Sequence, residues 1–208
     1  MQRSAFILTL MAFFFVPLVA QSPDGWEVRV DRSQNAEDPD DVPELMVMAM
    51  GDGFHVQGGP AGVFWNPTNS TGGDFTAKAT FNLLEPSGHT NYYGLTFGGE
   101  DLDGAGQRYV YFLVAQNGNY LIKTRDGETV GDIMASTPDA AVQTPGADGR
   151  STNMLEVRVA GDTISYVVNG TVVHTTPKAG ATAVTDGIVG VRVNHQLSVQ
   201  VEGFEVED

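Results

Sequence analysis

The sequence predicts an all-β fold of antiparallel strands, arranged as a sandwich or a barrel. Short segments rich in β-branched and aromatic residues alternate with turn residues roughly every eight to twelve positions, which is typical of such folds. No long segment has the 3.6-residue period of an amphipathic helix. Residues 21–208 have the length of one domain, and a chain of that size buries about 70% of its unfolded surface without needing disulfides.

The N-terminal residues 1–20 are predicted to be a signal peptide. Arg3 precedes an apolar run from Ala5 to Phe15, and small Ala20 precedes polar Gln21. A membrane span would need about 20 apolar residues, and this run is shorter. We therefore expect cleavage after Ala20, export to the periplasm or the medium, and no membrane span in the mature chain.

Composition limits the partners and the chemistry. The chain has a formal net charge of −15, which disfavours nucleic acid or an anionic membrane as a partner. It contains no cysteine, which excludes disulfides and a lipoprotein anchor at the cleavage site. Its four histidines do not follow zinc-ligand spacing. We expect a monomer.

The first mature strand is expected near Trp26 to Val30. A polar loop with prolines follows, and then three short strands in LMVMAM, GFHVQGG and AGVFW. Met46, Met48 and Met50 share one face of their strand. Because no histidine or cysteine lies at close spacing, we expect these methionines to fill gaps in the core rather than to bind metal.

The middle of the chain carries the densest mixture of aromatic and cationic residues. In residues 74–85 every second residue is apolar, which predicts a half-exposed strand. Residues 91–125 contain three further strand-like runs, with Leu95, Phe97 and Phe112 on the core side. If these strands are neighbours, their opposite side collects Tyr92, Tyr109, Tyr111, Lys123 and Arg125. Residues 126–151 are expected to form a long polar connection.

The C-terminal part predicts a β-meander. Two strands join at Gly161-Asp162, and a second hairpin turns at Asn169-Gly170, a pair that tolerates the positive φ of a type I′ turn. The strands GIVGVRVNH and LSVQVEGFEV follow. The inward parity of the last strand changes near Gly203, which predicts a β-bulge there.

The runs NMLEVRVAGDTISYVVNGTVVHTT and DGIVGVRVNHQLSVQVEGFEV resemble the C-terminal half of the bacterial 3-keto-disaccharide hydrolase-type domain. The matching positions are Asn153, Glu156, Asn169-Gly170, Gly190 and His195, and NYYGLTF is similar to an earlier strand of that family. The resemblance covers roughly residues 73–207. It implies a two-sheet antiparallel β-sandwich, the jelly roll of concanavalin A-like lectins and glucanases. Arg192 stands where the family has a glutamine.

Three functions remain open from the sequence. In the first, the protein is a secreted glycan-binding module in which tyrosines stack on sugar rings and polar groups bind hydroxyls. The candidate residues are Tyr92, Tyr109, Tyr111, Lys123, Arg125, Arg108, Asn194 and His89. In the second, as the resemblance implies, it is a hydrolase or lyase acting on glycosides, with Glu156 as acid or base, Asn153 as orienter and His195 as proton partner. The third is a structural envelope protein.

Asp101 and Asp103 are candidate ligands for a structural Ca²⁺. With Glu100 they place three carboxylates in a glycine-rich loop, and Ca²⁺ prefers six to eight oxygen ligands. The loop lacks the helical flanks and the final acidic ligand of an EF-hand, so a bare acidic turn is the alternative.

Overall fold

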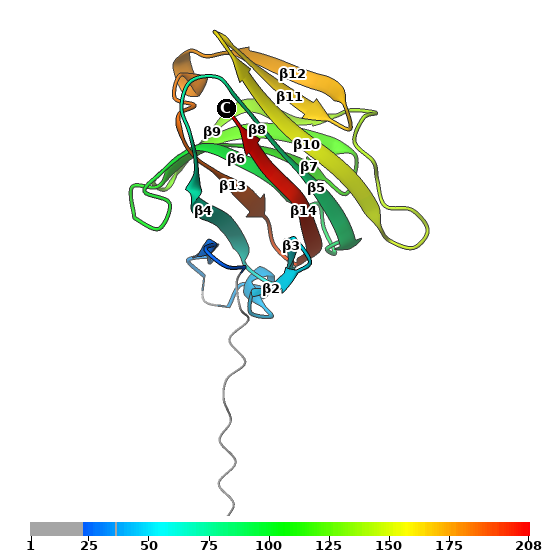
Figure 1. Cartoon of the computed structure of the whole chain (residues 1–208). Helices are drawn as coiled ribbons and strands as arrows, with labels where there is room; N and C mark the ends of the chain where they lie inside the picture. Colours follow the sequence, from blue (N-terminus) through cyan, green and yellow to red (C-terminus); the bar gives the residue numbers. More distant parts are fainter. Residues whose placement is uncertain (1–22, 36) are drawn as a thin grey trace, which may run out of the picture.

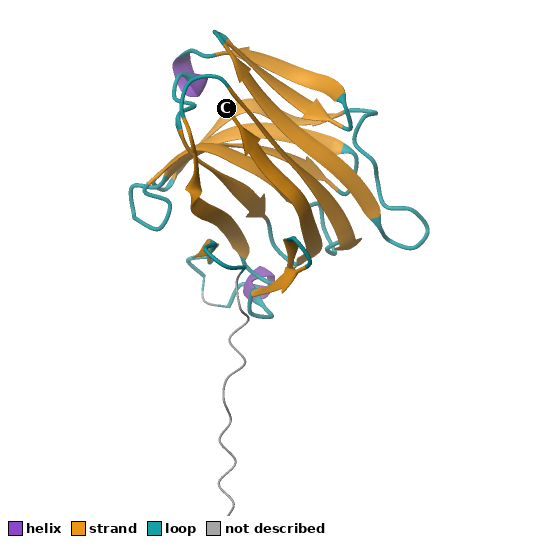
Figure 2. Cartoon of the chain, viewed as in Figure 1, coloured by secondary structure: helices purple, strands orange, loops and turns teal. Residues whose placement is uncertain are grey.

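Two seven-stranded antiparallel sheets face each other and enclose the main hydrophobic core (Figure 1). The computed structural model describes residues 23–35 and 37–208, so the predicted signal peptide and its cleavage site lie outside the described residues. Figure 2 shows that the regular structure of the described chain consists of strands joined by loops, apart from two short 3-10 turns, η1 (Pro39–Asp41) and η2 (Gly180–Thr182). This is a β-sandwich of the jelly-roll type, as predicted. No helix in these residues is long and apolar enough to cross a membrane.

The strands of each sheet come from distant parts of the chain. Sheet A has the order β1 (Glu27–Asp31), β4 (Ala61–Thr71), β13 (Gly187–Val193), β6 (Tyr92–Glu100), β7 (Arg108–Ala115), β8 (Asn119–Asp126) and β9 (Thr129–Pro138). Sheet B has the order β12 (Thr171–Pro177), β11 (Thr163–Val168), β10 (Ser151–Ala160), β5 (Phe75–Glu85), β14 (Leu197–Glu207), β3 (Gly53–Gly58) and β2 (Met46–Met50). The last two strands of the chain, β13 and β14, therefore belong to opposite sheets.

Aromatic pairs join the two sheets across the core. Phe81 of β5 lies 5.7 Å from Tyr93 of β6, and Tyr166 of β11 lies 5.3 Å from Phe112 of β7, measured between ring centroids. All four rings are fully buried. Burying a side chain of this size stabilises the fold by about 1.5–3 kcal/mol, so these pairs are among the main contacts that hold the sheets together.

Several local predictions are confirmed. In β5 the residues Phe75, Ala77, Ala79, Phe81 and Leu83 are buried and alternate with half-exposed ones. Asn169 and Gly170 both have positive φ, 49° and 81°, at the β11–β12 turn. Gly203 has φ 57° and lies where the pairing of β14 with β5 shifts register between Glu202 and Glu205, which is the expected bulge.

Two predictions about the scaffold are wrong. Met46, Met48 and Met50 are 41%, 38% and 40% exposed, because the alternating residue Val47 is the one that points into the core. Residues 126–151 are not one long connection, since residues 129–138 form the edge strand β9 against β8. Most residues of β9 are exposed or half-buried, so this segment has no alternation of apolar and polar residues from which a strand could be predicted.

Candidate functional site

The outer face of sheet A, which faces away from sheet B, carries a second hydrophobic cluster and a polar network. Period-two alternation points Tyr109 and Tyr111 to this face while Val110 and Phe112 enter the main core, as predicted. The pairing confirms that β6, β7 and β8 are neighbours. The cluster contains Val63, Trp65, Leu102, Tyr109, Tyr111, Leu113 and Leu121, with Tyr92 and Ile188 packed against it.

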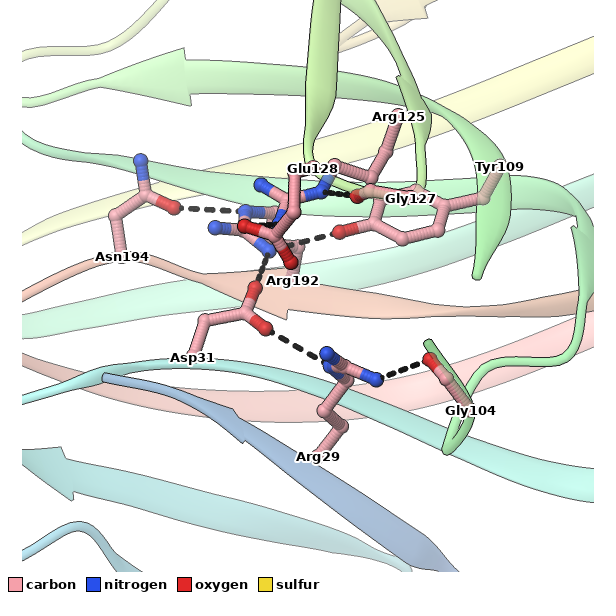
Figure 3. A network of polar contacts seen from close by, with 9 residues as sticks. All are labelled: Arg29, Asp31, Gly104, Tyr109, Arg125, Gly127, Glu128, Arg192 and Asn194. Atoms are coloured by element: carbon pink, nitrogen blue, oxygen red, sulfur yellow. Dashed lines mark hydrogen bonds and ion pairs between the residues drawn. The ribbon is translucent and has the colours of Figure 1, made fainter. Parts of the chain in front are cut away.

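Asp31 lies at the centre of the polar network (Figure 3). Its Oδ2 accepts a hydrogen bond from Arg192 Nη1 at 2.6 Å, and its Oδ1 accepts one from Arg29 Nε at 3.1 Å. Arg192 Nη1 also donates to the Tyr109 hydroxyl at 2.9 Å, and its Nε donates to Asn194 Oδ1 at 3.0 Å. One carboxylate thus fixes two guanidinium groups from different strands.

Arg192 fits this face because its strand neighbours leave room for it. It is directly opposite Val63 on β4 and Gly94 on β6. Valine is short and glycine has no side chain, so neither residue displaces the arginine. Its guanidinium lies 5.6 Å from the centroid of the Tyr111 ring, within cation–π range. The ring and the carboxylate together offset the cost of burying the charge.

Arg29 connects this network to the β6–β7 connection. Its Nη1 donates to the carbonyl of Gly104 at 2.5 Å (Figure 3). With the Gln107 amide turned so that its oxygen faces Arg29, that oxygen accepts from Arg29 Nη2 and Nε at 3.1 and 3.2 Å. The connection is therefore held against β1 by charge-assisted hydrogen bonds.

The network perturbs the ionisation of its members. Burial alone would raise the pKa of Asp31, but the charge and hydrogen bond of Arg192, with the hydrogen bond of Arg29, lower it below its usual value. Burial raises the pKa values of Tyr109 and Tyr111. At neutral pH the site therefore combines an ionised carboxylate with neutral phenols.

A cavity of about 550 Å³ opens above this network. It is lined by Arg29, Val30, Asp31, Arg32, Ser33, Asp38, Asp40, Ala61, Arg125, Glu128, Arg192 and His195. Four of the chain's eight arginines are in this lining, together with four carboxylates. The cavity therefore presents many hydrogen-bond donors and acceptors while its formal charges balance.

The predicted glycan-binding residues gather near this face, but most already have internal partners. Lys123 forms an ion pair with Asp132 at 3.0 Å, Arg125 lies 3.6 Å from Glu128, and Tyr92 shares a hydrogen bond with Ser136 at 2.7 Å. Arg108 pairs closely with Glu100 at the far end of the face. Asn194 accepts from Arg192.

Tyr109 and Tyr111 do not offer the open stacking surface that the sequence suggested. They are only 2% and 8% exposed. The Tyr109 hydroxyl is bonded to Arg192, and the guanidinium of Arg192 lies over the Tyr111 ring. The two tyrosines support the arginine at the floor of the site instead of meeting solvent.

The two histidines singled out from the sequence both lie at this end of the molecule. His195, on the β13–β14 connection, lines the cavity, and its Nδ1 is buried without a hydrogen-bond partner among the described residues. His89 is about half exposed and lies 3.4 Å from the carboxylate of Asp40, which also lines the cavity. His89 thus lies at the edge of the site, where it contacts the cavity-lining residue Asp40.

The three residues that the family resemblance implied as catalytic are not brought together. Asn153 is fully buried on the inner face of β10, where it bonds Tyr93, Gln143 and Asn169. Glu156 lies on the outer face of sheet B in a close ion pair with Arg158. His195 lines the cavity of sheet A. Asn153 and Glu156 differ by an odd number of positions on one strand, so alternation places them on opposite faces.

The acidic loop is stabilised from within. Oδ2 of Asp101 accepts from the backbone N–H of Gly106 at 3.0 Å, while Asp103 is exposed. In residues 23–35 and 37–208, histidine and acidic side chains nowhere form a group of three that could hold a metal ion. Within the described residues, the Ca²⁺ candidates Asp101 and Asp103 thus do not form a group of three with another carboxylate or a histidine.

The central residues of the site, Asp31 and Arg192, were not predicted as functional. Spacing along the chain gives Asp31 no partner, because Arg192 comes 161 residues later. One signal was present in the sequence. A charged residue within the apolar run GIVGVRV is unusual unless it is paired.

The fold of this chain is a jelly-roll β-sandwich of the galectin-like kind. It is similar to a carbohydrate-binding module, CBM66, from Bacillus subtilis (TM-score 0.63, 13% identity, 88% of this chain and 96% of the other covered). A Bacillus subtilis protein of unknown function with a galectin-like fold has a TM-score of 0.61 at 12% identity, with 88% of each chain covered.

An endo-β-1,3-glucanase from Pyrococcus furiosus is also similar (TM-score 0.54, 9% identity, 77% of this chain and 76% of the other covered). No protein-family model and no curated protein matches the sequence. These likenesses establish the fold.

Proposed function

We propose that the protein is an exported carbohydrate-binding module whose ligand occupies the cavity above Asp31 and Arg192. The observation that carries this proposal is the array Arg29–Asp31–Arg192, held rigidly at the floor of an open polar cavity. A sugar hydroxyl donates and accepts hydrogen bonds at once, and neighbouring hydroxyls suit the fixed donor and acceptor pairs of such an array. Preorganised side chains also lose little entropy on binding.

The dimensions of the site support this ligand class. A cavity of 550 Å³ lies within the range of about 300–1,000 Å³ typical of small-molecule sites. Its lining is richer in charged groups than most drug-like sites, which favours a polyhydroxylated ligand over an apolar one. The similar structures include a carbohydrate-binding module and a glucanase, which agrees with a glycan ligand.

The hydrolase or lyase alternative has less support. The residues that the resemblance nominates for acid–base chemistry lie on the inner face of sheet B, on its outer face and at the cavity of sheet A. General acid–base catalysis requires these groups within hydrogen-bond reach of one substrate. We therefore propose binding in preference to turnover.

The test is a glycan array probed with mature protein, followed by titration calorimetry on the best ligand. Arg32 lines the cavity and Arg158 lies on the outer face of sheet B, yet both side chains are 47% exposed and both pair with a glutamate. Arg32→Ala is expected to weaken binding about tenfold, the scale of one lost charge-assisted hydrogen bond. Arg158→Ala is the matched control and should bind like the wild type.

Equal affinities for the two variants would contradict this location, and a lack of any glycan ligand would contradict the function. Export is tested separately by mass spectrometry of the protein recovered outside the cytoplasm. We expect a mature chain that begins at Gln21, since small Ala20 precedes the expected cleavage site.

A further inference from the structure

A row of exposed methionines lies on sheet B, whereas the proposed glycan site lies on sheet A. Met46, Met48 and Met50 occupy alternate positions of β2, the edge strand of sheet B, and project from its outer face. We refer to these three residues as the methionine row. Large apolar side chains at an exposed sheet edge invite aggregation, and soluble proteins usually place charged residues there. The methionine row therefore requires an explanation other than core packing.

A histidine completes this surface. The antiparallel pairing of β2 with β3 places His55 directly opposite Met48, so their side chains project from the same face with Cβ atoms about 4.5–5.5 Å apart. Gly53 is directly opposite Met50 and contributes no side chain, since a Cβ there would collide with the Val201 carbonyl of β14. The sequence shows no histidine within four residues of the row, and only the hairpin brings one close.

His55 is held in a defined state. It is 8% exposed, and its Nε2 is hydrogen-bonded to the Ser198 hydroxyl at 2.8 Å, while no hydrogen bond engages Nδ1 within the described part of the chain. One of its two ring nitrogens is thus fixed by a second residue, as is usual for a metal-ligating histidine.

We propose that the methionine row and His55 form a binding site for a soft monovalent metal ion, Cu(I) or its redox-inert analogue Ag(I). Thioether sulfur is a soft ligand that selects Cu(I) over hard cations, and imidazole also binds copper. Consecutive members of the row are about 6.6–6.8 Å apart along the strand, a span that the flexible methionine side chain can close around one ion. The site needs no carboxylate and is separate from the acidic loop at Asp101.

The test uses Ag(I) in chloride-free buffer, with mature protein carrying ¹³C-labelled methionine methyl groups. One equivalent of Ag(I) is expected to shift the methyl resonances of the methionine row and to leave those of Met134 and Met154 in place. Met154 is the matched control, because it is 37% exposed on the outer face of the same sheet but belongs to β10. Cu(I) affinity is then measured under anaerobic conditions by competition with a chromogenic chelator.

Met48→Leu and His55→Gln are each expected to weaken Ag(I) and Cu(I) binding about tenfold or more, whereas Met154→Leu should not change it. Thermal unfolding of each variant shows whether the fold is intact, and Met48→Leu replaces one exposed apolar side chain by another of similar volume. Equal shifts of the methyl resonances of Met154 and of the methionine row would show nonspecific binding of the metal to thioethers and would overturn the proposal. An unchanged metal affinity in Met48→Leu would overturn it too. The absence of any Ag(I) binding would overturn it as well.

Discussion

Asp31 and Arg192 are 161 residues apart in sequence, yet Oδ2 of one lies 2.6 Å from Nη1 of the other. Their strands, β1 and β13, both pair with β4 and so approach from its two sides. Both side chains are nearly buried, 13% and 12% exposed. The pair forms the floor of the proposed glycan site and also joins the first described strand to one of the last.

Replacing Arg192 by methionine is expected to destabilise the protein by about 3 kcal/mol, because it leaves the buried Asp31 carboxylate without its main partner. Urea unfolding measures this change. The double variant Asp31→Asn with Arg192→Met should be more stable than the sum of the single changes implies, since it leaves no charge of the pair unpaired. Additive effects would show that the two residues are not coupled.

Acid should weaken the same pair. The pKa of Asp31 is lowered in the folded protein, so its stabilising contribution is fully present above the unfolded-state pKa of about 3.9 and is lost as the pH falls below that value. The difference in melting temperature between wild type and Asp31→Asn is therefore expected to be constant from pH 7 to about pH 5 and to shrink towards pH 2. A difference that grows on acidification would contradict the assigned charge state.

Asn153 is expected to be a structural residue and not a catalytic one. It is fully buried, accepts from the Gln143 N–H and from Asn169, and donates to Tyr93 and to the Gln143 carbonyl. Asn153→Ala should cost about 3 kcal/mol in the free energy of unfolding, because it leaves buried partners unsatisfied. Asn119→Ala is the control, since that amide bonds Ser136 near the surface, and a loss under about 1 kcal/mol is expected.

Alkaline conditions should destabilise the fold through buried tyrosine. Burial raises the pKa of Tyr166 to about 12, against the weaker opposing hydrogen bond to Thr176. Since the unfolded phenol ionises near pH 10, stability is expected to fall by up to about 1.4 kcal/mol per pH unit between the two values for this group. Tyr166→Phe should show a shallower decline above pH 10 in chemical denaturation. If stability falls equally steeply with pH in wild type and Tyr166→Phe, the responsible ionisation belongs to another group.

Chelator treatment is expected to leave the melting temperature unchanged, because the Asp101 carboxylate is engaged by its own loop at the Gly106 N–H. Asp101→Ala should instead lower stability by about 1 kcal/mol, since the capping bond is lost and a residue with φ 50° is replaced by one less tolerant of that conformation. A drop in melting temperature of the wild type in chelator, reversed by Ca²⁺, would restore the predicted calcium site.

Local patterns in the sequence predict the fold class and most of the strands. Period-two alternation in β5, β6 and β7 specified which residues face the core, and the residues at Asn169-Gly170 and Gly203 specified a turn and a bulge, because these are local properties of the backbone. The same local reasoning is wrong for β9 and for the methionine row. Both lie on edge strands, where most side chains of β9 and the three methionines are exposed.

The composition of the glycan site depends on the tertiary structure. The partner of Asp31 is supplied by β13, and pairing between strands so distant in the sequence cannot be inferred from spacing along the chain. The burial of Tyr109 and Tyr111 also depends on the tertiary structure, because the side chain that contacts both of them belongs to Arg192. Alternation fixes the face on which a residue lies, whereas its exposure and its partners depend on which strands become neighbours.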